Sequence, residues 1–151
     1  MSDEIIMIDK QSKMFLAGPA LVKAAIGEIT DDESFGGAEF HSFQSGVNDY
    51  FVNSETEAIQ TCRKIIKSNS NNFDIDSIEK NESLYNIIPE DARLPIDVLD
   101  LIKNIVDNNS FIEFKANYAT SIITGYATIA NFKVAIIANN EALLANSAQK
   151  A

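Results

Sequence analysis

The stretch Phe15-Leu-Ala-Gly-Pro-Ala-Leu-Val-Lys-Ala-Ala-Ile-Gly-Glu28 decides how this chain begins to fold. Within it, Gly18-Pro19 predicts a helix start, because proline has no N–H to lose in a first helical turn. Gly27 predicts the end of that helix as a C-cap. Before the turn, Met14–Ala17 favours a short buried strand. The side chains that we expect to face inward from the helix are Leu21, Val22 and Ala25.

Two further helices are predicted from capping residues and apolar spacing. Ser54–Glu57 forms a capping box that opens a helix running to about Lys67, with Cys62 expected on its buried face. Residues 68–83 are then rich in serine, asparagine and charge, which indicates a flexible linker. Asp97 is the expected N-cap of the next helix. The inward side chains of that helix are expected to be Val98, Leu101, Ile102, Ile105 and Val106.

The remaining elements indicate a mixed sheet. Residues 49–52 are typical of a strand, and residues 31–37 of an acidic loop with one helical turn. Ser121–Ile129 and Lys133–Ala138 are β-rich runs, and the residues between them indicate a hairpin. Residues 141–151 favour a helix. Strands alternate with helices at first and a hairpin follows, which predicts an α/β architecture with a mixed sheet.

Composition excludes several classes of protein. The chain has 151 residues and a net charge of −10, so nucleic acid and anionic membranes would repel it. It has one cysteine, so it contains no internal disulfide.

His41 lacks the neighbours that a metal site needs, which favours a structural or pocket-lining role. Asp74, Asp76 and Glu79 lack the central glycine and distal glutamate of a calcium loop. We therefore expect no metal in this chain.

Two ordered sets of motifs resemble one known family. The first set joins the opening stretch to Gly36-Gly-Ala-Glu-Phe-His41 and Ser45-Gly-Val47. The second set is Phe111-Ile-Glu-Phe-Lys-Ala-Asn-Tyr118, Gly125-Tyr-Ala127 and Ala138-Asn-Asn140. In this order and spacing, they resemble the carboxyltransferase (β) subunit of biotin-dependent acyl-CoA carboxylases, of the methylcrotonyl-CoA and propionyl-CoA carboxylase type.

The resemblance implies a fold, an extent and an activity. It implies the crotonase-like fold (the ClpP/crotonase ββα spiral) of carboxyltransferase domains, here incomplete. Residues 1–138 would be the second half of the N-terminal domain, and residues 139–151 the truncated start of the following segment. The full subunit would transfer a carboxyl group from carboxybiotin to an acyl-CoA, and the resemblance favours a methylcrotonyl-CoA-like substrate. Both oxyanion-hole segments would lie outside this central fragment, so we expect no catalytic residue within it.

The same resemblance implies cofactors and partners. Biotin would be carried by a partner subunit or domain, and the partners would be acyl-CoA and a biotin carboxylase or biotin carrier subunit. The full-length protein would form a homo-oligomer, without nucleic acid or membrane. Its compartment would be the cytoplasm in a bacterium and the mitochondrial matrix in a eukaryote.

Six residues are implied by the resemblance to bind acyl-CoA. They are Lys23, Phe111, Phe114, Lys115, Tyr118 and Gly125. Aromatic rings beside lysines would suit an adenine ring and its phosphates. Other interpretations stay open: Lys23 as a solvent-facing helix residue, and Phe111 or Phe114 as a core residue. Gly36-Gly37 is better explained as a tight loop that lets backbones approach than as a phosphate cradle.

Departures from the family pattern support an alternative. The family carries an arginine where this chain has Thr128, and a glycine at Glu141. It also prefers glycine or proline near Asn131, Lys133 and Ala135. Glycines of the family pattern are thus replaced at positions where only glycine tolerates a positive φ or the close approach of a ligand. The alternative is a non-catalytic truncated remnant that at most binds CoA or partner subunits. An independent crotonase-like hydratase would need its own Gly-Gly oxyanion turn and an acidic base, and the sequence offers no such pair.

Overall fold

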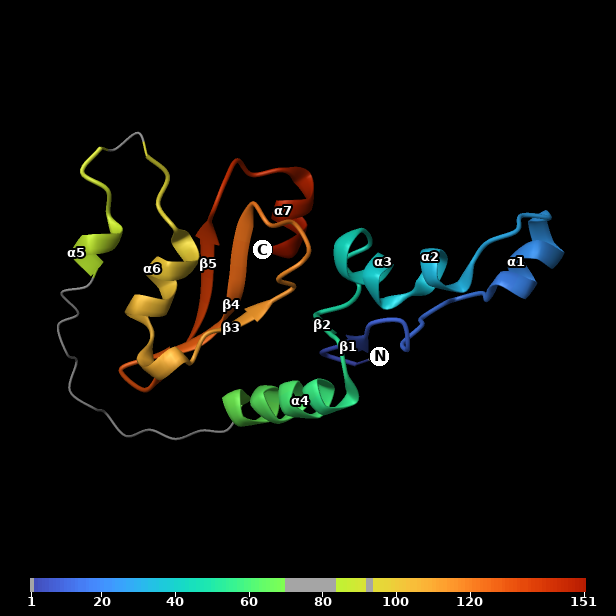
Figure 1. The fold of residues 1–151 in the computed structure, drawn as a ribbon, viewed down its shortest axis with the longest axis horizontal. Helices are drawn as coiled ribbons and strands as arrows, with labels where there is room; N and C mark the ends of the chain where they lie inside the picture. Colours follow the sequence, from blue (N-terminus) through green and yellow to red (C-terminus); the bar gives the residue numbers. More distant parts are fainter. Residues whose placement is uncertain (1, 70–83, 92–93) are drawn as a thin grey trace. The chain divides into compact units, whose positions relative to one another are not determined.

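The computed structural model describes residues 2–69, 84–91 and 94–151 (Figure 1). The chain forms two compact units, one of Met1–Lys67 with Lys115–Tyr118 and one of Ser68–Phe114 with Ala119–Ala151. The predicted linker lies outside the described residues from position 70 to 83, as do Asp74, Asp76 and Glu79. The combination of helices and strands confirms the predicted α/β class. The prediction of a mixed sheet was wrong for the described residues, whose strands form two separate sheets, one parallel and one antiparallel.

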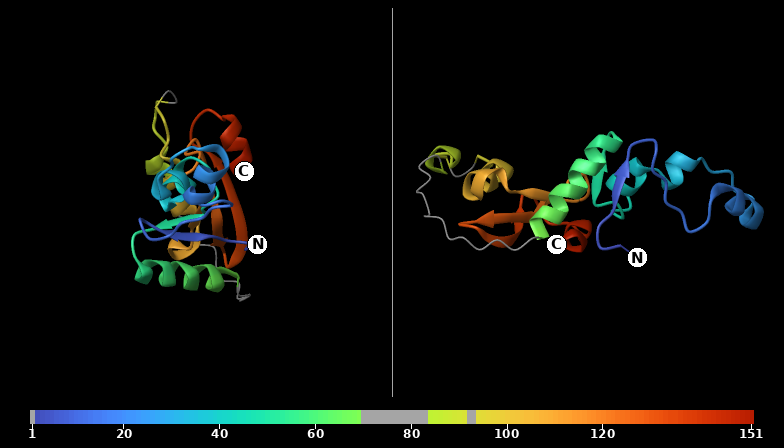
Figure 2. Two further views of the ribbon diagram at one scale, coloured as in Figure 1. Left: turned by 90° about the vertical axis from the view of Figure 1, so that its right-hand side faces the viewer. Right: turned by 90° about the horizontal axis from the view of Figure 1, so that it is seen from below.

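The first unit is built on a short parallel strand pair. β1 (Ile6–Ile8) pairs with β2 (Tyr50–Val52), with Ile6 opposite Tyr50 (Figure 2). The predicted strand at residues 49–52 is therefore confirmed. The buried apolar side chains of this unit come from both strands and from the start of α3, and they are Met7, Ala38, Tyr50 and Val52.

The helix predicted from the opening stretch is present, but its surroundings differ from the prediction. α1 (Pro19–Ile26) starts with proline in its first turn and ends at Gly27, whose φ is +74°. No strand forms at residues 14–17, and this prediction was wrong. The prediction of inward side chains was also wrong, because α1 buries none of its residues and Leu21 is 60% exposed. The reason is that no described helix or strand packs extensively against α1.

Two short helices follow, joined by the Gly-Gly pair. α2 (Asp32–Gly36) has Asp31 as its N-cap, whose carboxylate accepts from two backbone N–H groups, and α3 is Ala38–Phe43. A Cβ on Gly36 would lie 2.6 Å from the Met14 carbonyl oxygen and 2.2 Å from the Phe15 ring. This confirms the close-approach interpretation of the pair, since any side chain there would collide with the preceding segment.

The capping-box helix is α4 (Glu55–Asn69). Ser54 accepts a hydrogen bond from the Glu57 N–H at 3.2 Å, as predicted. The Glu57 carboxylate, however, reaches the Asn53 N–H rather than the N–H of Ser54. Cys62 is exposed, so its predicted place on a buried face was wrong.

The second unit is an antiparallel sheet covered by helix α6 (Figure 1). Its strand order is β3 (Ile112–Phe114), β4 (Ile122–Ile129), β5 (Phe132–Asn139). α6 (Val98–Ile105) begins at the predicted cap Asp97, which accepts from the Asp100 N–H at 2.9 Å. Ile102 and Val106 are buried as predicted, whereas Ile105 is 44% exposed. Ile102 and Val106 pack with Ile123 and Ala127 of β4 to form the core.

Shorter elements complete the second unit. α5 (Leu84–Ile87) precedes α6, and the 3₁₀ turn η1 (Asp107–Asn109) follows it. α7 (Ala145–Lys150) lies at the end of the chain, within the predicted helical segment but shorter than it. α7 is tied to the residue before β4, because the buried hydroxyls of Ser147 and Ser121 are hydrogen-bonded to each other.

The β4–β5 hairpin turns on Ala130 and Asn131, as the sequence predicted. Both residues have a positive φ, +50° and +63°, a conformation that costs energy for any residue with a Cβ. The Asp107 carboxylate accepts from both turn N–H groups, at 2.9 Å from Ala130 and 2.7 Å from Asn131. The turn is therefore held from outside by η1, and this support offsets its intrinsic strain.

Candidate functional site

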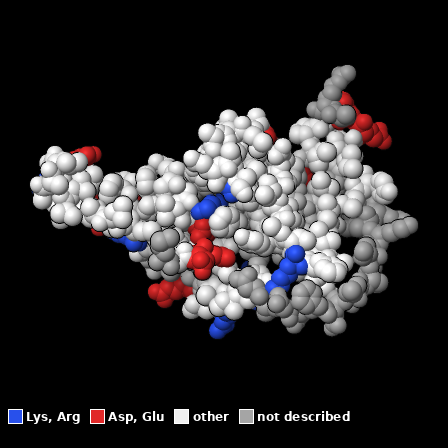
Figure 3. Space-filling view, turned by 180° about the vertical axis from the view of Figure 1, so that it is seen from behind, with Lys and Arg blue, Asp and Glu red and all other residues white. Residues whose placement is uncertain are grey.

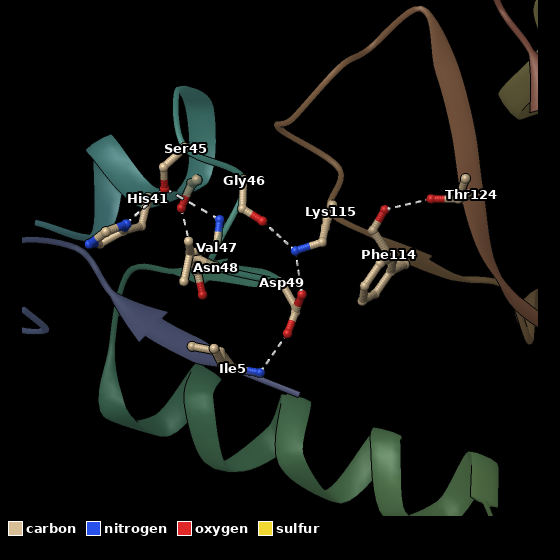
Figure 4. Close-up of polar contacts among 11 residues, drawn as sticks. Ile5, His41, Ser45, Gly46, Val47, Asn48, Asp49, Phe114, Lys115 and Thr124 are labelled. Atoms are coloured by element: carbon tan, nitrogen blue, oxygen red, sulfur yellow. Dashed lines mark hydrogen bonds and ion pairs between the residues drawn. The ribbon is translucent and has the colours of Figure 1, made fainter. Parts of the chain in front are cut away.

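Asp49 is the centre of a polar network in the first unit (Figure 4). Its side chain is only 7% exposed, and its Oδ1 lies 2.6 Å from the Lys115 ammonium. Its Oδ2 accepts the Ile5 N–H at 2.7 Å, immediately before β1. One carboxylate therefore ties the entry to β1, the entry to β2 and the segment at Lys115 together.

Lys115 is held at several points besides the Asp49 carboxylate. Its ammonium donates to the Gly46 carbonyl oxygen at 2.5 Å, and its own N–H donates to the Asp49 carbonyl oxygen at 3.2 Å. Its φ is +51°, which a lysine adopts only where the surroundings hold it. A Cβ on Gly46 would lie 2.9 Å from the Tyr118 ring, so Tyr118 packs directly on this glycine.

His41 and Asn48 extend the network toward α3. The buried His41 ring contacts the Ser45 hydroxyl at 2.8 Å through Nδ1, and its Nε2 donates to the Met14 carbonyl oxygen at 2.9 Å. Asn48 donates through its amide nitrogen to the Ser42 hydroxyl at 2.7 Å. These contacts confirm the structural role predicted for His41, which fastens the Met14 segment to α3.

Lys23, the other lysine implied by the resemblance, lies exposed on α1. It is the only charged residue of that helix, and its carbonyl oxygen accepts the capping N–H of Gly27. This exposure matches the solvent-facing alternative, and it also leaves the ammonium accessible to an anionic ligand.

The remaining predicted residues belong to the second unit. Phe111 packs against the core cluster, and its ring would lie 2.5 Å from a Cβ on Gly125. Phe111 is therefore the core residue that the sequence left as an alternative, and Gly125 makes room for it. Phe114 makes an edge-to-face contact with Tyr126, with ring centroids 6.5 Å apart.

Two carboxylates in the second unit have shifted pKa values. Hydrogen bonds from the Asn131 and Ala130 N–H groups and from Thr128 lower the pKa of Asp107, against an opposing effect of burial. Burial raises the pKa of Glu113, and the charges of Lys150 and Lys103 partly oppose this rise. As an anion, Asp107 accepts hydrogen bonds that stabilise the hairpin. Burial destabilises the charged form of Glu113.

Asp49 is a residue of this polar network that the sequence did not indicate as a site residue. It appeared only as the first residue of a predicted strand, and no spacing rule connects it with Lys115. Lys115 and Tyr118 come together with it in the first unit, while Phe111, Phe114 and Gly125 lie in the second. A pairing between residues so far apart in sequence depends on the tertiary fold.

The described part of the chain holds neither a metal-binding cluster nor a membrane-spanning helix. Residues 2–69, 84–91 and 94–151 hold no group of three or more histidine, cysteine or carboxylate side chains placed to bind a metal ion. Over the same residues, no helix has the length and apolar character needed to cross a membrane.

Comparisons with known proteins agree on one family. Residues 1–151 match the family model described as a carboxyl transferase domain. A probable biotin-dependent acyl-coenzyme A carboxylase beta2 subunit of Mycobacterium tuberculosis is 42% identical over 100% of this chain and 30% of its own length. The mitochondrial methylcrotonoyl-CoA carboxylase beta chain of Dictyostelium discoideum is 40% identical over 99% of this chain and 27% of its own length. The chain thus spans about 30% of the curated relatives it matches.

Solved structures agree with these matches. Transcarboxylase 12S with hydrolysed methylmalonyl-coenzyme A bound superposes with a TM-score of 0.78 at 32% identity, over 92% of this chain and 29% of that one. A single-chain, multi-domain long-chain acyl-CoA carboxylase gives a TM-score of 0.79 at 20% identity, over 91% of this chain and 14% of that one, and shows the fold alone. The predicted crotonase-like carboxyltransferase fold is thereby confirmed for this part of the domain.

Proposed function

The chain belongs to the carboxyl transferase family, and from this premise we propose that it is the central part of the carboxyltransferase β subunit of a biotin-dependent acyl-CoA carboxylase. The observation that carries the proposal is the match over residues 1–151 together with the superposition on transcarboxylase 12S at 32% identity. Residues 1–138 would form the second half of the N-terminal domain, and residues 139–151 the start of the next segment.

The proposed reaction of the whole subunit is carboxyl transfer. The acyl-CoA loses a proton from the carbon next to, or conjugated with, the thioester carbonyl. That carbon then bonds to the carboxyl carbon as the bond to biotin breaks, and the biotin nitrogen takes up a proton. Backbone N–H groups would stabilise the enolate and ureido oxyanions, which is the usual way to stabilise charge without a catalytic side chain. The resemblance assigns those N–H groups to segments outside this chain.

The finer proposals concern substrate, partners and place. A methylcrotonyl-CoA-like substrate is favoured, because relatives named for methylcrotonyl-CoA carboxylase are 34–40% identical to this chain. A partner subunit or domain would carry the biotin, with a biotin carboxylase to load it, and the full protein would be a homo-oligomer. It would act in the bacterial cytoplasm or the mitochondrial matrix.

The six residues implied by the resemblance are proposed to have different roles in acyl-CoA binding. The exposure of Lys23 supports direct contact with a CoA phosphate. The ion pair of Lys115 and the packing of Tyr118 on Gly46 support positioning of the loop that carries them. The packing of Phe111 on Gly125 supports shaping of the sheet. Phe114, partly exposed beside Tyr126, is the candidate to contact the adenine ring.

A thermal melt of the 151-residue chain with and without millimolar CoA tests this proposal. We expect a cooperative transition that CoA raises, because a ligand that binds only the folded state stabilises it. Lys23→Ala should reduce the shift, and Glu28→Gln, an exposed residue just beyond α1, should leave it unchanged. A transition indifferent to CoA in the unaltered chain would contradict binding.

The non-catalytic remnant stays a second candidate because of one specific observation. Ala130 and Asn131 occupy left-handed backbone positions in the hairpin, where the family prefers glycine or proline nearby. The Asp107 contacts compensate for this strain, so the departure has left the fold intact. If the remnant interpretation is correct, the chain at most binds CoA or partner subunits, and a subunit that carries these residues fails to carboxylate an acyl-CoA.

A further inference from the structure

The charge of Lys115 is already in use within the first unit. Its ammonium lies 2.6 Å from the Asp49 carboxylate and donates to the Gly46 carbonyl oxygen at 2.5 Å (Figure 4). The side chains of Lys115 and Asp49 are only 16% and 7% exposed. Moving the ammonium away would leave a largely buried carboxylate without its cation, which is strongly unfavourable. Lys115 is therefore poorly suited to turn toward a phosphate of CoA.

Cations are scarce in this chain, so it matters which of them could bind a phosphate. The sequence has 12 lysine and arginine residues against 22 aspartate and glutamate residues. On the face drawn in Figure 3, the described basic side chains lie scattered among acidic and uncharged ones. A site for an anionic ligand thus depends on single lysines, and a lysine paired closely with a carboxylate adds little net attraction to it.

The pair instead fixes the backbone of residues 115–118. Lys115 opens this segment and Ala119 follows it, with φ of +51° and +48°, left-handed conformations that residues with a Cβ adopt only where contacts hold them. The Lys115 N–H donates to the Asp49 carbonyl oxygen at 3.2 Å, and the Tyr118 N–H donates to the Lys115 carbonyl oxygen at 3.0 Å. Asp49 therefore holds Lys115 through its main chain and its side chain at once.

Asp49 is itself fixed, at the entry to β2. Its Oδ2 accepts the Ile5 N–H at 2.7 Å, and its own N–H donates to the Ile5 carbonyl oxygen at 3.1 Å. These bonds join it to the residue before β1. A group held in this way can orient a neighbouring segment before any ligand arrives. Any polypeptide packed over this network would bury the pair more deeply.

Gly46 is the point on which the fixed segment rests. Its carbonyl oxygen accepts from the Lys115 ammonium, and the Tyr118 ring packs on its Cα, where a Cβ would lie only 2.9 Å from the ring. Gly46 has a φ of +69°, so a side chain there would also be strained. The Asp49 carboxylate thus acts through Lys115 on both the Gly46 loop and the backbone that carries Tyr118.

We propose that Asp49 is a positioning residue for acyl-CoA binding, whose carboxylate neutralises Lys115 and fixes residues 115–118 against Gly46, while the Lys115 ammonium makes no contact with a CoA phosphate. This role rests on the proposed function, because it concerns how the chain binds acyl-CoA. It adds to the site a residue that no sequence motif assigned.

Calorimetric titration of the 151-residue chain with CoA tests this role, at a temperature where circular dichroism shows each variant to be folded. Asp49→Asn and Lys115→Met should each raise the Kd for CoA about 10-fold, and the double variant should raise it no further than either one. Asp32→Asn, at the exposed pair with Lys13, is the matched control and should leave the Kd unchanged. Tighter CoA binding by Asp49→Asn would mean that the freed lysine binds a phosphate, contrary to the proposal.

The salt dependence of the Kd gives a second measure of direct contact. Lys115→Met should keep the salt dependence of the unaltered chain, because dissolved ions screen a contact between ligand and lysine and not a pair closed off inside the protein. A weaker salt dependence in Lys115→Met would reveal a contact with phosphate and would refute the proposed role.

Hydrogen–deuterium exchange separates positioning from a purely structural role. In Asp49→Asn, the Lys115 and Tyr118 amides should exchange at least about 10-fold faster, while the Gly27 amide, bonded at the end of α1, should not change. Unchanged exchange at Lys115 and Tyr118 would mean that Asp49 does not hold the segment. Faster exchange with an unchanged Kd for CoA would make Asp49 purely structural, and either result overturns the proposal.

Failure of the proposed function would give a different result. If the unaltered chain does not bind CoA, acyl-CoA binding itself is contradicted, and Asp49 has no ligand to position. If the unaltered chain binds CoA and Asp49→Asn binds it equally well, acyl-CoA binding stands and only the role of Asp49 is wrong.

Discussion

The second unit is held by a continuous apolar core, whereas the first unit depends on buried polar contacts. In the second, Ile102 and Val106 of α6 pack against Ile123 and Ala127 of β4. In the first, the Asp49 carboxylate and the His41 ring join segments that lie far apart in sequence. The two units should therefore lose stability in different ways: the second through loss of packing, the first through loss of a single polar partner.

The largest effect is expected from the apolar core of the second unit. Ile102→Ala should lower the free energy of unfolding by about 3 kcal/mol, because it removes buried methyl groups and leaves a cavity. Ile105→Ala, at a 44% exposed residue of the same helix, should cost less than about 1 kcal/mol. Urea denaturation followed by circular dichroism gives both values. Similar costs would show that the core does not lie where the structure places it.

The next effect is expected from the ion pair of the first unit. Asp49→Ala should cost about 2–3 kcal/mol, because it leaves the largely buried Lys115 ammonium without its carboxylate. Adding Lys115→Met should restore part of that loss, as a double-mutant cycle would reveal. The control is Asp32→Ala at the exposed Lys13 pair, expected to cost under about 1 kcal/mol. Additive effects of the two substitutions would contradict a coupled pair.

Gly125 tests how closely the strands of the second unit approach each other. Gly125→Ala should cost about 2 kcal/mol, because the new Cβ would lie 2.4 Å from the Ile112 carbonyl oxygen. Gly18→Ala is the comparison, since a Cβ there meets nothing within 4 Å. Thermal melts of both variants measure the difference. A Gly125→Ala protein as stable as the unaltered chain would show that β3 and β4 are spaced more widely.

The smallest effect should depend on pH. Hydrogen bonds from the hairpin N–H groups lower the pKa of Asp107, so its stabilising contribution is complete above the unfolded-state pKa and is lost as pH falls through the folded-state value. Asp107→Ala should cost about 1–2 kcal/mol at neutral pH and progressively less in acid. Urea titrations from neutral to strongly acidic pH would show this convergence. A cost that does not change with pH would contradict the anionic role of Asp107.

Glu113 should act with the opposite sign. Burial raises the pKa of its carboxyl, so its charged form destabilises the second unit and stability falls as pH rises through the folded-state value. Glu113→Gln should therefore flatten that part of the pH profile. Because the carboxyl is only half-buried, solvent screens the effect and we expect it to be slight.

Local rules predicted the elements whose cause is local. The caps at Gly18-Pro19, Gly27, Ser54 and Asp97 depend on nearby backbone groups, and all four are present. The turn at Ala130 and Asn131 was also predicted, although its support by Asp107 was not. Burial was the weaker part of the prediction, because apolar spacing alone placed α1 and Cys62 inside.

The candidate site was predictable only through family resemblance. Motif spacing identified Lys115 and Tyr118, but nothing local connected them with Asp49 or Gly46. These contacts arise because residues 115–118 fold into the first unit although the sequence on either side belongs to the second. Such an arrangement is a property of the tertiary fold, and no short-range pattern encodes it.

The proposed carboxyltransferase role can be measured in a chimera in which this chain replaces the matching segment of the Mycobacterium tuberculosis beta2 subunit. Supplied with carboxybiotin and methylcrotonyl-CoA or propionyl-CoA, the chimera should form a carboxylated CoA product that avidin suppresses. The avidin arm confirms that turnover depends on biotin. The proposal predicts measurable turnover, because these residues would supply the central part of the carboxyltransferase domain. A folded, CoA-binding chimera that carboxylates neither acyl-CoA would contradict the proposed function. It would favour the alternative that this chain is a non-catalytic remnant.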